Sequence, residues 1–418
     1  MNKLKVVWIC HLSNSSIRNN LKFGGWNLLA LLRKIMHINP ITDFAIWNTN
    51  AIKEFEKFED IDLHIVAPHY QITALQEFEI NGVYYHFFHS EDDSIFHILK
   101  NKITHKTPNS YKRNAHKISE IIGTIQPQII HMIGAENPYY GESALTLPTN
   151  IPLIVSLQTL MCDPNFEKNY PISHHSYLYR SKVESDIIRR ADYIGTTVQY
   201  FRDIITAQIC PATKFLDLTL AVGEDIDIKE HEKIYDFVYY AADISKAIDY
   251  ALEAFAIAKQ QYPHITLHVV GGYNEFTMID IQGIMQRLGL GLEVTFTGRL
   301  ATREDVIQEI CKARFALLPL KVDMIASTIR EAMANGLPVV TTETPLTPKM
   351  NQSRESILLS NKGDFCAMAD NMCKLLSNDK YVALLKKNAV ETLTELYSNK
   401  AAMQKWRDCY YQILEKQL

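Results

Sequence analysis

The chain has 418 residues, of which 47% are apolar and 22% are charged, and its formal net charge is −4. A chain of this length and composition is typical of a globular protein with two or three domains, which excludes an intrinsically disordered protein. A net charge this close to zero gives no support for nucleic-acid binding through bulk electrostatics.

Cysteine spacing and hydropathy indicate in which cellular compartment the protein is found. The 7 cysteines are scattered and contain no Cys-x-x-Cys pair, so the sequence predicts neither a disulfide framework nor a metal site. The apolar run at 3–10 is too short for a signal peptide, and no run reaches the roughly 18 apolar residues of a membrane span. We therefore expect a cytoplasmic protein, with at most a peripheral contact with the inner face of the membrane.

The first half of the chain alternates buried strands with helices. A strand at 5–10 is followed by a polar loop, by Gly24 and Gly25, and by an apolar helix at 26–36. Paired glycines let the backbone approach a ligand closely, and a helix start favours an anion, although an ordinary loop gives the same pattern. Further elements are predicted for strands at 62–67, 83–88, 128–133, 153–157 and 192–196, and for helices at 50–58, 110–125, 177–190 and 198–208.

Two features of this half point to surface or ligand contacts. The strand at 128–133 contains His131 and leads to Gly134 and Glu136 at its carboxyl end, where ligands of open parallel sheets bind. Residues 97–117 are loop-like and basic. A solvated surface is the simpler interpretation of this basic stretch, and a site for an acceptor or a membrane surface is the alternative.

The second half repeats the alternation after an irregular segment at 211–235, which we interpret as a hinge. Strands are predicted at 236–241, 266–270, 293–297, 315–320 and 339–342, and helices at 245–261, 279–288, 303–313, 329–335, 364–376, 381–396 and 401–414. Strict alternation implies parallel sheets with right-handed crossovers. The fold class is therefore α/β, with two doubly wound, Rossmann-like domains.

One stretch of the second half, at 315–342, combines a strand end with two acids. Asp323 lies in the loop after the strand, and Ser327 and Thr328 can cap the helix that contains Glu331. A helix start beside the carboxyl end of a parallel strand favours a phosphate group. Glu331 could accept hydrogen bonds from the vicinal hydroxyls of a ribose, although a surface acid favoured by the helix dipole is equally consistent.

Lys246 and the absence of several known motifs limit the classes of reaction that the sequence supports. Lys246 lies in the first turn of a predicted helix, where it suits a diphosphate, although many such lysines are merely solvated. No Gly-x-Gly-x-x-Gly follows a predicted strand, and the P-loop, Gly-x-Ser-x-Gly and His-Glu-x-x-His motifs are absent. Dehydrogenase, P-loop, serine hydrolase and zinc protease chemistry therefore lack support.

Residues 331–340, Glu-Ala-Met-Ala-Asn-Gly-Leu-Pro-Val-Val, resemble the carboxyl-terminal signature of family 4 glycosyltransferases, the retaining group 1 enzymes with the GT-B fold. The surrounding order agrees with this family, because Lys246, Gly271-Gly272 and Thr297-Gly298 follow its donor motif and its next two strand ends. The resemblance implies two domains that face each other across a cleft. It assigns 1–215 to the acceptor side, 216–395 to the nucleotide sugar, and 396–418 to a helix that packs back on the first domain.

The family resemblance implies an enzyme that transfers a sugar from a nucleotide-diphosphate donor to a glycan or glycolipid acceptor with retention of anomeric configuration. Such enzymes serve polysaccharide biosynthesis and need neither a metal nor a further cofactor in the usual case, and the sequence leaves UDP and GDP open. The implied catalytic residues are Asp323, His131 and Lys246. The implied donor-binding residues are Glu331, Lys246, Ala326, Ser327, Thr328, Gly271, Gly272, Thr297, Gly298, Arg299, Gly24 and Gly25.

The chain departs from the family pattern near the expected chemistry. Asp323 stands in place of a glutamate, Ala241 in place of a frequent arginine, and Ala247 in place of the glycine after Lys246. These departures keep open a non-catalytic GT-B module that binds a sugar nucleotide or a partner. A nucleotide-sugar epimerase on the same fold is a second alternative.

Overall fold

The computed structural model describes residues 3–23, 43–69, 71–90, 111–166, 172–223, 226–241, 247–321 and 327–416. The chain forms two compact units. The first contains the described residues of Met1–Lys168, Ile172–Val222 and Asn399–Leu418, and the second those of Gly223–Ser398. No helix of the described ranges has the length and hydrophobicity needed to cross a membrane.

The first unit is built on a sheet with the strand order β3-β4-β2-β1-β5-β6-β7-β8. All neighbours pair in parallel except β3 and β4, which are antiparallel. Successive strands are added on one side of β1 from β2 to β4 and on its other side from β5 to β8, as in a doubly wound fold. The strands are β1 (Leu4–Ile9), β2 (Ile61–His69), β3 (Gln76–Ile80), β4 (Val83–His89), β5 (Ile129–Ile133), β6 (Leu153–Ser156), β7 (Tyr193–Gly195) and β8 (Phe215–Leu216).

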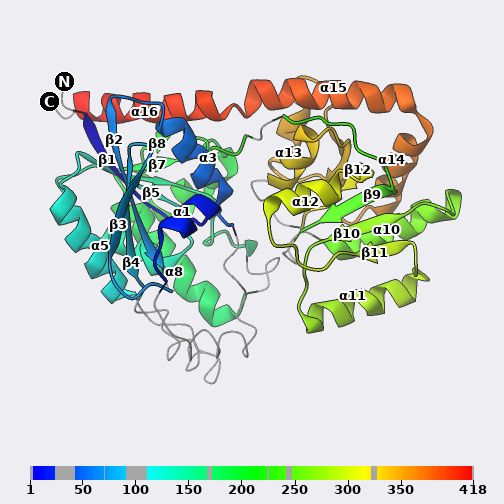
Figure 1. The fold of residues 1–418 in the computed structure, drawn as a ribbon, viewed down its shortest axis with the longest axis horizontal. Coiled ribbons are helices and arrows are strands. Elements are labelled where there is room, and N and C mark those ends of the chain that lie inside the picture. Colours follow the sequence, from blue (N-terminus) through cyan, green and yellow to red (C-terminus); the bar gives the residue numbers. More distant parts are fainter. Residues whose placement is uncertain are drawn as a thin grey trace. The chain divides into compact units, whose positions relative to one another are not determined.

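Helices of the first unit pack on both faces of this sheet. Val7 and Ile9 of β1 lie in a core shared with α5 and α8, whereas Trp8 contacts Phe55 of α3 and Trp406 of α16. The side chains of a strand alternate between its two faces, so each face has its own core. The helices are α1 (Ser15–Asn20), α3 (Ile46–Phe55), α5 (Lys112–Ile125), α6 (Pro138–Gly141), α8 (His174–Arg190), α9 (Gln199–Ile204) and α16 (Asn399–Glu415), with short 3₁₀ and π turns at Glu142–Leu145 and Ile205–Ile209 (Figure 1).

The second unit contains a parallel sheet with the order β11-β10-β9-β12-β13-β14. Its strands are β9 (Tyr235–Tyr240), β10 (Leu267–Val270), β11 (Val294–Phe296), β12 (Ala313–Leu317), β13 (Val339–Thr342) and β14 (Leu358–Ser360). Its helices are α10 (Ile248–Gln261), α11 (Glu275–Leu288), α12 (Arg303–Ile310), α13 (Ser327–Ala334), α14 (Phe365–Ser377) and α15 (Asp379–Leu396), with a 3₁₀ turn at Thr347–Asn351.

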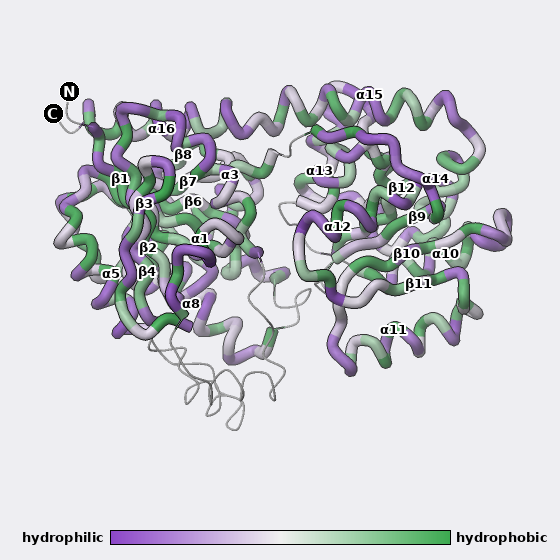
Figure 2. The backbone as a smooth tube through the Cα atoms, viewed as in Figure 1, coloured by the Kyte–Doolittle hydropathy of each residue, from purple (hydrophilic) through white to green (hydrophobic). Residues whose placement is uncertain are grey.

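The two faces of the second sheet bury separate cores. Phe237 and Tyr239 of β9 pack with α10, α11 and α14, and Val238 and Tyr240 pack with α12, α13 and α15. The last four residues of β9 and all of β10 are buried, and Figure 2 shows α15 with alternating hydrophilic and hydrophobic stretches. This pattern is expected of parallel strands covered on both faces by amphipathic helices.

The structure confirms the α/β prediction and corrects two details of it. The strand β3 was missed because its residues, Gln-Glu-Phe-Glu-Ile, alternate over only two apolar positions and include two glutamates, a residue type depleted in strands. In the predicted hinge at 211–235, Phe215 and Leu216 form β8 and pair with β7. A strand of 2 residues is too short to give a periodic sequence signal.

A chain of buried hydrogen bonds joins α16 to the first sheet. The indole Nε1 of Trp8 donates to the hydroxyl of Tyr410 over 2.9 Å, and this hydroxyl lies 2.7 Å from His131 Nδ1. His131 Nε2 lies 2.8 Å from Ser156 Oγ. These polar groups are inaccessible to water, so each must find its partner within the protein. The helix α16 is thereby fixed to three neighbouring strands, β1, β5 and β6.

Replacement of Tyr410 by phenylalanine tests this connection. The substitution leaves the Trp8 indole and His131 Nδ1 without their shared partner, so we expect the free energy of unfolding of the first unit to fall by roughly 2–4 kcal/mol. Urea denaturation followed by tryptophan fluorescence measures the change. The matched control is Tyr411→Phe, whose hydroxyl bonds the partly exposed Asp60 over 2.7 Å and should cost less than about 1 kcal/mol. Equal losses in the two variants would contradict the account.

Candidate functional site

The carboxyl ends of β10 and β11 bring five of the predicted donor-binding residues together. Gly271 and Gly298 form an isolated bridge between the two loops. The hydroxyl of Thr297 accepts from the Gly271 amide over 3.3 Å and donates to the Gly298 carbonyl over 2.8 Å. Gly272 and Arg299 are adjacent in these loops. Exposed backbone therefore lines the edge of a parallel sheet where ligands of doubly wound folds bind.

Backbone geometry explains why this edge requires glycine. Gly271 has a φ of +134° and Gly298 a φ of +71°, values that side chains with a Cβ disfavour. A Cβ on Gly272 would lie 2.6 Å from Cβ of Arg299. The loops can approach each other, or a flat ligand, only because these side chains are absent.

Glu331 lies in the first turns of α13 and is held by a residue that the sequence analysis missed. Its Oε1 accepts a hydrogen bond from Nε of Arg303 over 2.9 Å, and the Glu331 side chain is 12% exposed. Arg303 begins α12, after an N-terminal capping box formed by Thr302 and Asp305. Because this pairing is nonlocal, sequence spacing gave no signal for it. The arginine fixes the orientation of the carboxylate without using both of its oxygens.

The start of α13 is tied to the end of β9. The hydroxyl of Tyr240 donates to the backbone carbonyl of Thr328, and the helix begins at Ser327, two residues before the predicted start. Ala241, which follows β9, is buried and supplies no charge where the resemblance implies a frequent arginine. Lys246, Asp323 and Ala326 lie outside the described residues, and so do Gly24 and Gly25 of the first unit.

A cation near this edge was also missed by the sequence analysis. Lys321 follows β12, and its Nζ lies 2.6 Å from Oδ2 of Asp249 in the first turn of α10. The same ammonium group lies 5.2 Å from the centre of the Tyr250 ring. This ion pair is partly exposed, so its net contribution to stability is small. Lys321 directly precedes the segment 322–326, which contains Asp323.

The residue before α10 has an unusual backbone conformation. Ala247 has a φ of +42° and is fully buried. A left-handed conformation costs a residue with a Cβ about 1 kcal/mol relative to glycine. The family resemblance implies glycine at this position, and the structure gives the physical reason for that preference.

The structure corrects the prediction for His131. The residue lies within β5, is fully buried, and is bonded at both ring nitrogens to Tyr410 and Ser156. Its ring centre is 4.3 Å from that of Trp406, and burial lowers its pKa to about 3. A neutral, enclosed imidazole with both nitrogens occupied cannot reach a donor. We therefore assign His131 to the packing of α16 rather than to catalysis.

A different acid lies at the carboxyl edge of the first sheet. Glu136 follows β5, is 7% exposed, and accepts from Asn137 Nδ2 over 2.8 Å through Oε1. Burial, together with the nearby charge of Glu184, raises the pKa of Glu136 to about 7, against a smaller opposing effect of Arg180. No group of histidine, cysteine and acidic side chains among the described residues could hold a metal ion.

Comparison with known proteins identifies the second unit. Residues 236–378, from β9 through α14, match a family model described as "Glycosyl transferases group 1". The chain therefore contains a group 1 glycosyltransferase domain. No curated protein matches the chain. The matched range contains Glu331 and the glycine loops at the ends of β10 and β11.

Solved structures are similar to this chain over nearly its full length. Sucrose-phosphate synthase from Thermosynechococcus elongatus has 16% identity and a TM-score of 0.70, covering 99% of this chain and 100% of its own. HepE from Anabaena has 14% identity and a TM-score of 0.65, covering 98% and 100%. A glycosyltransferase from Rickettsia africae has 11% identity and a TM-score of 0.61, covering 99% of each. At these identities the similarity establishes the fold, and it confirms the GT-B prediction.

Replacement of Gly272 by alanine tests the glycine edge. The new methyl group would collide with Arg299, so we expect a loss of roughly 1–3 kcal/mol in the stability of the second unit and weaker nucleotide binding. Chemical denaturation and calorimetric titration with UDP and GDP measure the two effects. The control is Gly283→Ala in α11, where a Cβ meets nothing within 4 Å and should stabilise the helix by about 0.5–1 kcal/mol. Unchanged stability and binding in the Gly272 variant would refute this constraint.

Proposed function

We propose that the protein transfers a sugar from a nucleotide-diphosphate donor to a hydroxyl of a glycan or glycolipid, with retention of anomeric configuration. The observation that carries the proposal is the convergence of five predicted donor-binding residues at the ends of β10 and β11, in a unit that also contains Glu331. The match of 236–378 to group 1 glycosyltransferases supports it. So does HepE, whose structure is a complex with UDP and glucose.

In this proposal the second unit holds the donor by chemically distinct contacts. The backbone of Thr297 and Gly298, with Arg299, borders the nucleobase. Glu331 accepts hydrogen bonds from the ribose through Oε2, since Arg303 is bonded to Oε1. The amides at the start of α13 bind diphosphate oxygens, because a helix start carries unpaired N–H groups and partial positive charge.

Charged side chains would act on the reacting groups. The bond between the sugar C1 and the diphosphate oxygen breaks, and a bond from C1 to the acceptor oxygen forms. The departing diphosphate takes up the proton of the acceptor hydroxyl. The products are the glycosylated acceptor and the nucleoside diphosphate. Lys246 neutralises the departing diphosphate and Asp323 borders the transferred sugar. Lys321 is available as a second cation if it leaves Asp249, 2.6 Å away, for the phosphate. Stabilising the charge that develops on the leaving group is the main electrostatic contribution.

This proposal specifies the acceptor only as a glycan or a glycolipid. A lipid-linked acceptor would bring the protein to the inner face of the membrane, whereas a free glycan would not. One alternative is a non-catalytic module that binds a sugar nucleotide or a partner, motivated by Ala241 in place of an arginine and by the altered glycine loop at 324–326. The other is a nucleotide-sugar epimerase on the same fold. Product analysis without an acceptor separates the epimerase from a transferase.

A donor panel tests the proposed function. Hydrolysis or transfer is measured with UDP- and GDP-sugars for the natural protein and for Glu331→Ala, Lys246→Ala and Asp323→Ala. We expect one nucleotide series to be used and kcat/KM to fall by about 10-fold or more in each variant, which corresponds to at least about 1.4 kcal/mol of transition-state stabilisation.

The control for this panel is Asp370→Ala. Asp370 is an exposed acid within α14, outside the loops after β10 and β11 and outside α13, and its loss should leave the rates within about 2-fold. Indifference to all three site substitutions would overturn the assignment of the site. Tight nucleotide binding without turnover of any donor would favour the non-catalytic alternative.

A further inference from the structure

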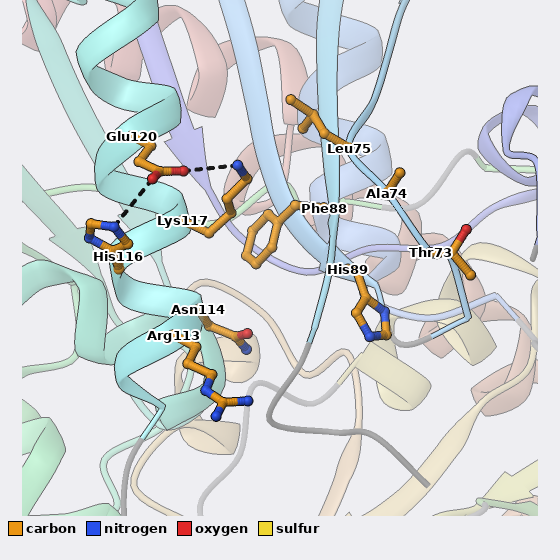
Figure 3. A pocket seen from close by; sticks show the side chains of 10 residues that line it. All are labelled: Thr73, Ala74, Leu75, Phe88, His89, Arg113, Asn114, His116, Lys117 and Glu120. Atoms are coloured by element: carbon orange, nitrogen blue, oxygen red, sulfur yellow. Dashed lines mark hydrogen bonds and ion pairs between the residues drawn. The ribbon is translucent and has the colours of Figure 1, made fainter.

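The first unit contains a pocket of about 480 Å³ beside the carboxyl end of β4. Its walls come from the loop before β3, the last residues of β4, and the first turns of α5. Figure 3 shows Arg113 and Asn114 of α5 on one side, Thr73 and His89 on the other, and Phe88 between them. The volume falls within the range of small-molecule sites.

The lining of the pocket is rich in nitrogen donors. Arg113, His116 and Lys117 come from α5 and His89 from β4, and Glu120 is the only acid among the residues that line the pocket. Glu120 is bonded to Lys117 over 2.8 Å and lies 3.2 Å from His116 Nε2. Guanidinium and ammonium groups around a pocket favour an oxyanion, because each can form charge-assisted hydrogen bonds with it.

The helix α5 has positively charged side chains at its N-terminal end, beside this pocket. Its first turn contains no acid, and cations stand in its first two turns although the helix dipole places partial positive charge there. A cation at this end of a helix is disfavoured, so a stable arrangement of this kind is expected where function requires it. A bound anion would be attracted by the side-chain charges and by the helix dipole together.

The walls of the pocket are fixed by buried contacts. Asn114 is 1% exposed, and its Nδ2 donates to Ser90 Oγ over 2.8 Å and to the Tyr139 carbonyl over 2.9 Å. These bonds connect the start of α5 with the residue that follows β4. The pocket is therefore preorganised, which reduces the entropy that a ligand must offset on binding.

His89 supplies a second indication of a ligand, independent of the helix. Its Nδ1 is buried and makes no hydrogen bond within the described part of the chain. Leaving a buried polar atom without a partner costs about 1–3 kcal/mol, so such atoms are rare outside sites that await a ligand or water. The ring can donate to an oxyanion or accept from a protonated one.

We propose that this pocket binds an anionic group, a phosphate or a carboxylate, of the sugar acceptor. The inference rests on the proposed function and makes it more specific, because the acceptor would be an acidic glycan or a phosphate-linked glycolipid. It also favours the acceptor-site alternative for the basic stretch at 97–117. Among the described residues of this stretch, Arg113, His116 and Lys117 line the pocket, and Lys112 lies outside it.

Calorimetric titration with small probes tests the pocket. The natural protein is titrated with glucose 1-phosphate, glucuronate and neutral glucose, and the same probes are applied to Arg113→Gln and His89→Asn. We expect at least one acidic probe to bind, glucose not to bind, and affinity to fall by about 10-fold in each variant. Binding of glucose 1-phosphate identifies the anionic group as a phosphate, and binding of glucuronate identifies it as a carboxylate. Circular dichroism melting checks that both variants remain folded.

The matched control is Lys182→Gln. Lys182 is an exposed cation of α8 in the same unit, paired with Asp186, and its removal lowers the net charge as Arg113→Gln does. Equal weakening by both substitutions, or no binding of either acid, would overturn the proposal. The titration needs neither donor nor turnover, so its failure is distinguishable from failure of the donor panel.

Discussion

Parallel pairing of strands is the constraint on which the candidate site depends. In the second sheet every neighbouring pair is parallel, so all strand ends that can meet a ligand lie at one edge. Side-chain bulk is excluded there by Gly271 and Gly272, and charge is supplied by residues on helices that begin at the same edge. The order of the strands therefore sets where a ligand can bind, and the side chains at that edge set which ligand it can be.

The same constraint explains what could be predicted from the sequence. Long alternating elements and the motif at 331–340 sufficed for the fold and for the glycine loops, because both are local patterns. Arg303 and Lys321 were missed because their partners, Glu331 and Asp249, lie far away in the sequence. A residue's side-chain environment cannot be read from spacing alone. His131 illustrates this limit, since its strand was predicted while its burial under α16 was not.

The two units divide the properties expected of a glycosyltransferase. The second combines exposed backbone with an oriented carboxylate, which suits a nucleotide. The first has a pocket of about 480 Å³ lined by cations, and a separate buried acid, Glu136, at the carboxyl edge of its sheet. Other buried polar groups of the first unit form hydrogen bonds with one another, as Trp8, Tyr410 and His131 do. Buried polar groups thus divide into those with internal partners and those left for a ligand.

The central claim is that the nucleotide binds at the carboxyl edge of the second sheet. Hydrogen–deuterium exchange with and without UDP or GDP tests it most directly, because protection is measured along the whole chain without a known acceptor. The account predicts slower exchange in the loops after β10 and β11 and in the first turn of α13. Protection confined to the first unit, from a nucleotide that the enzyme also turns over as a sugar donor, would contradict it.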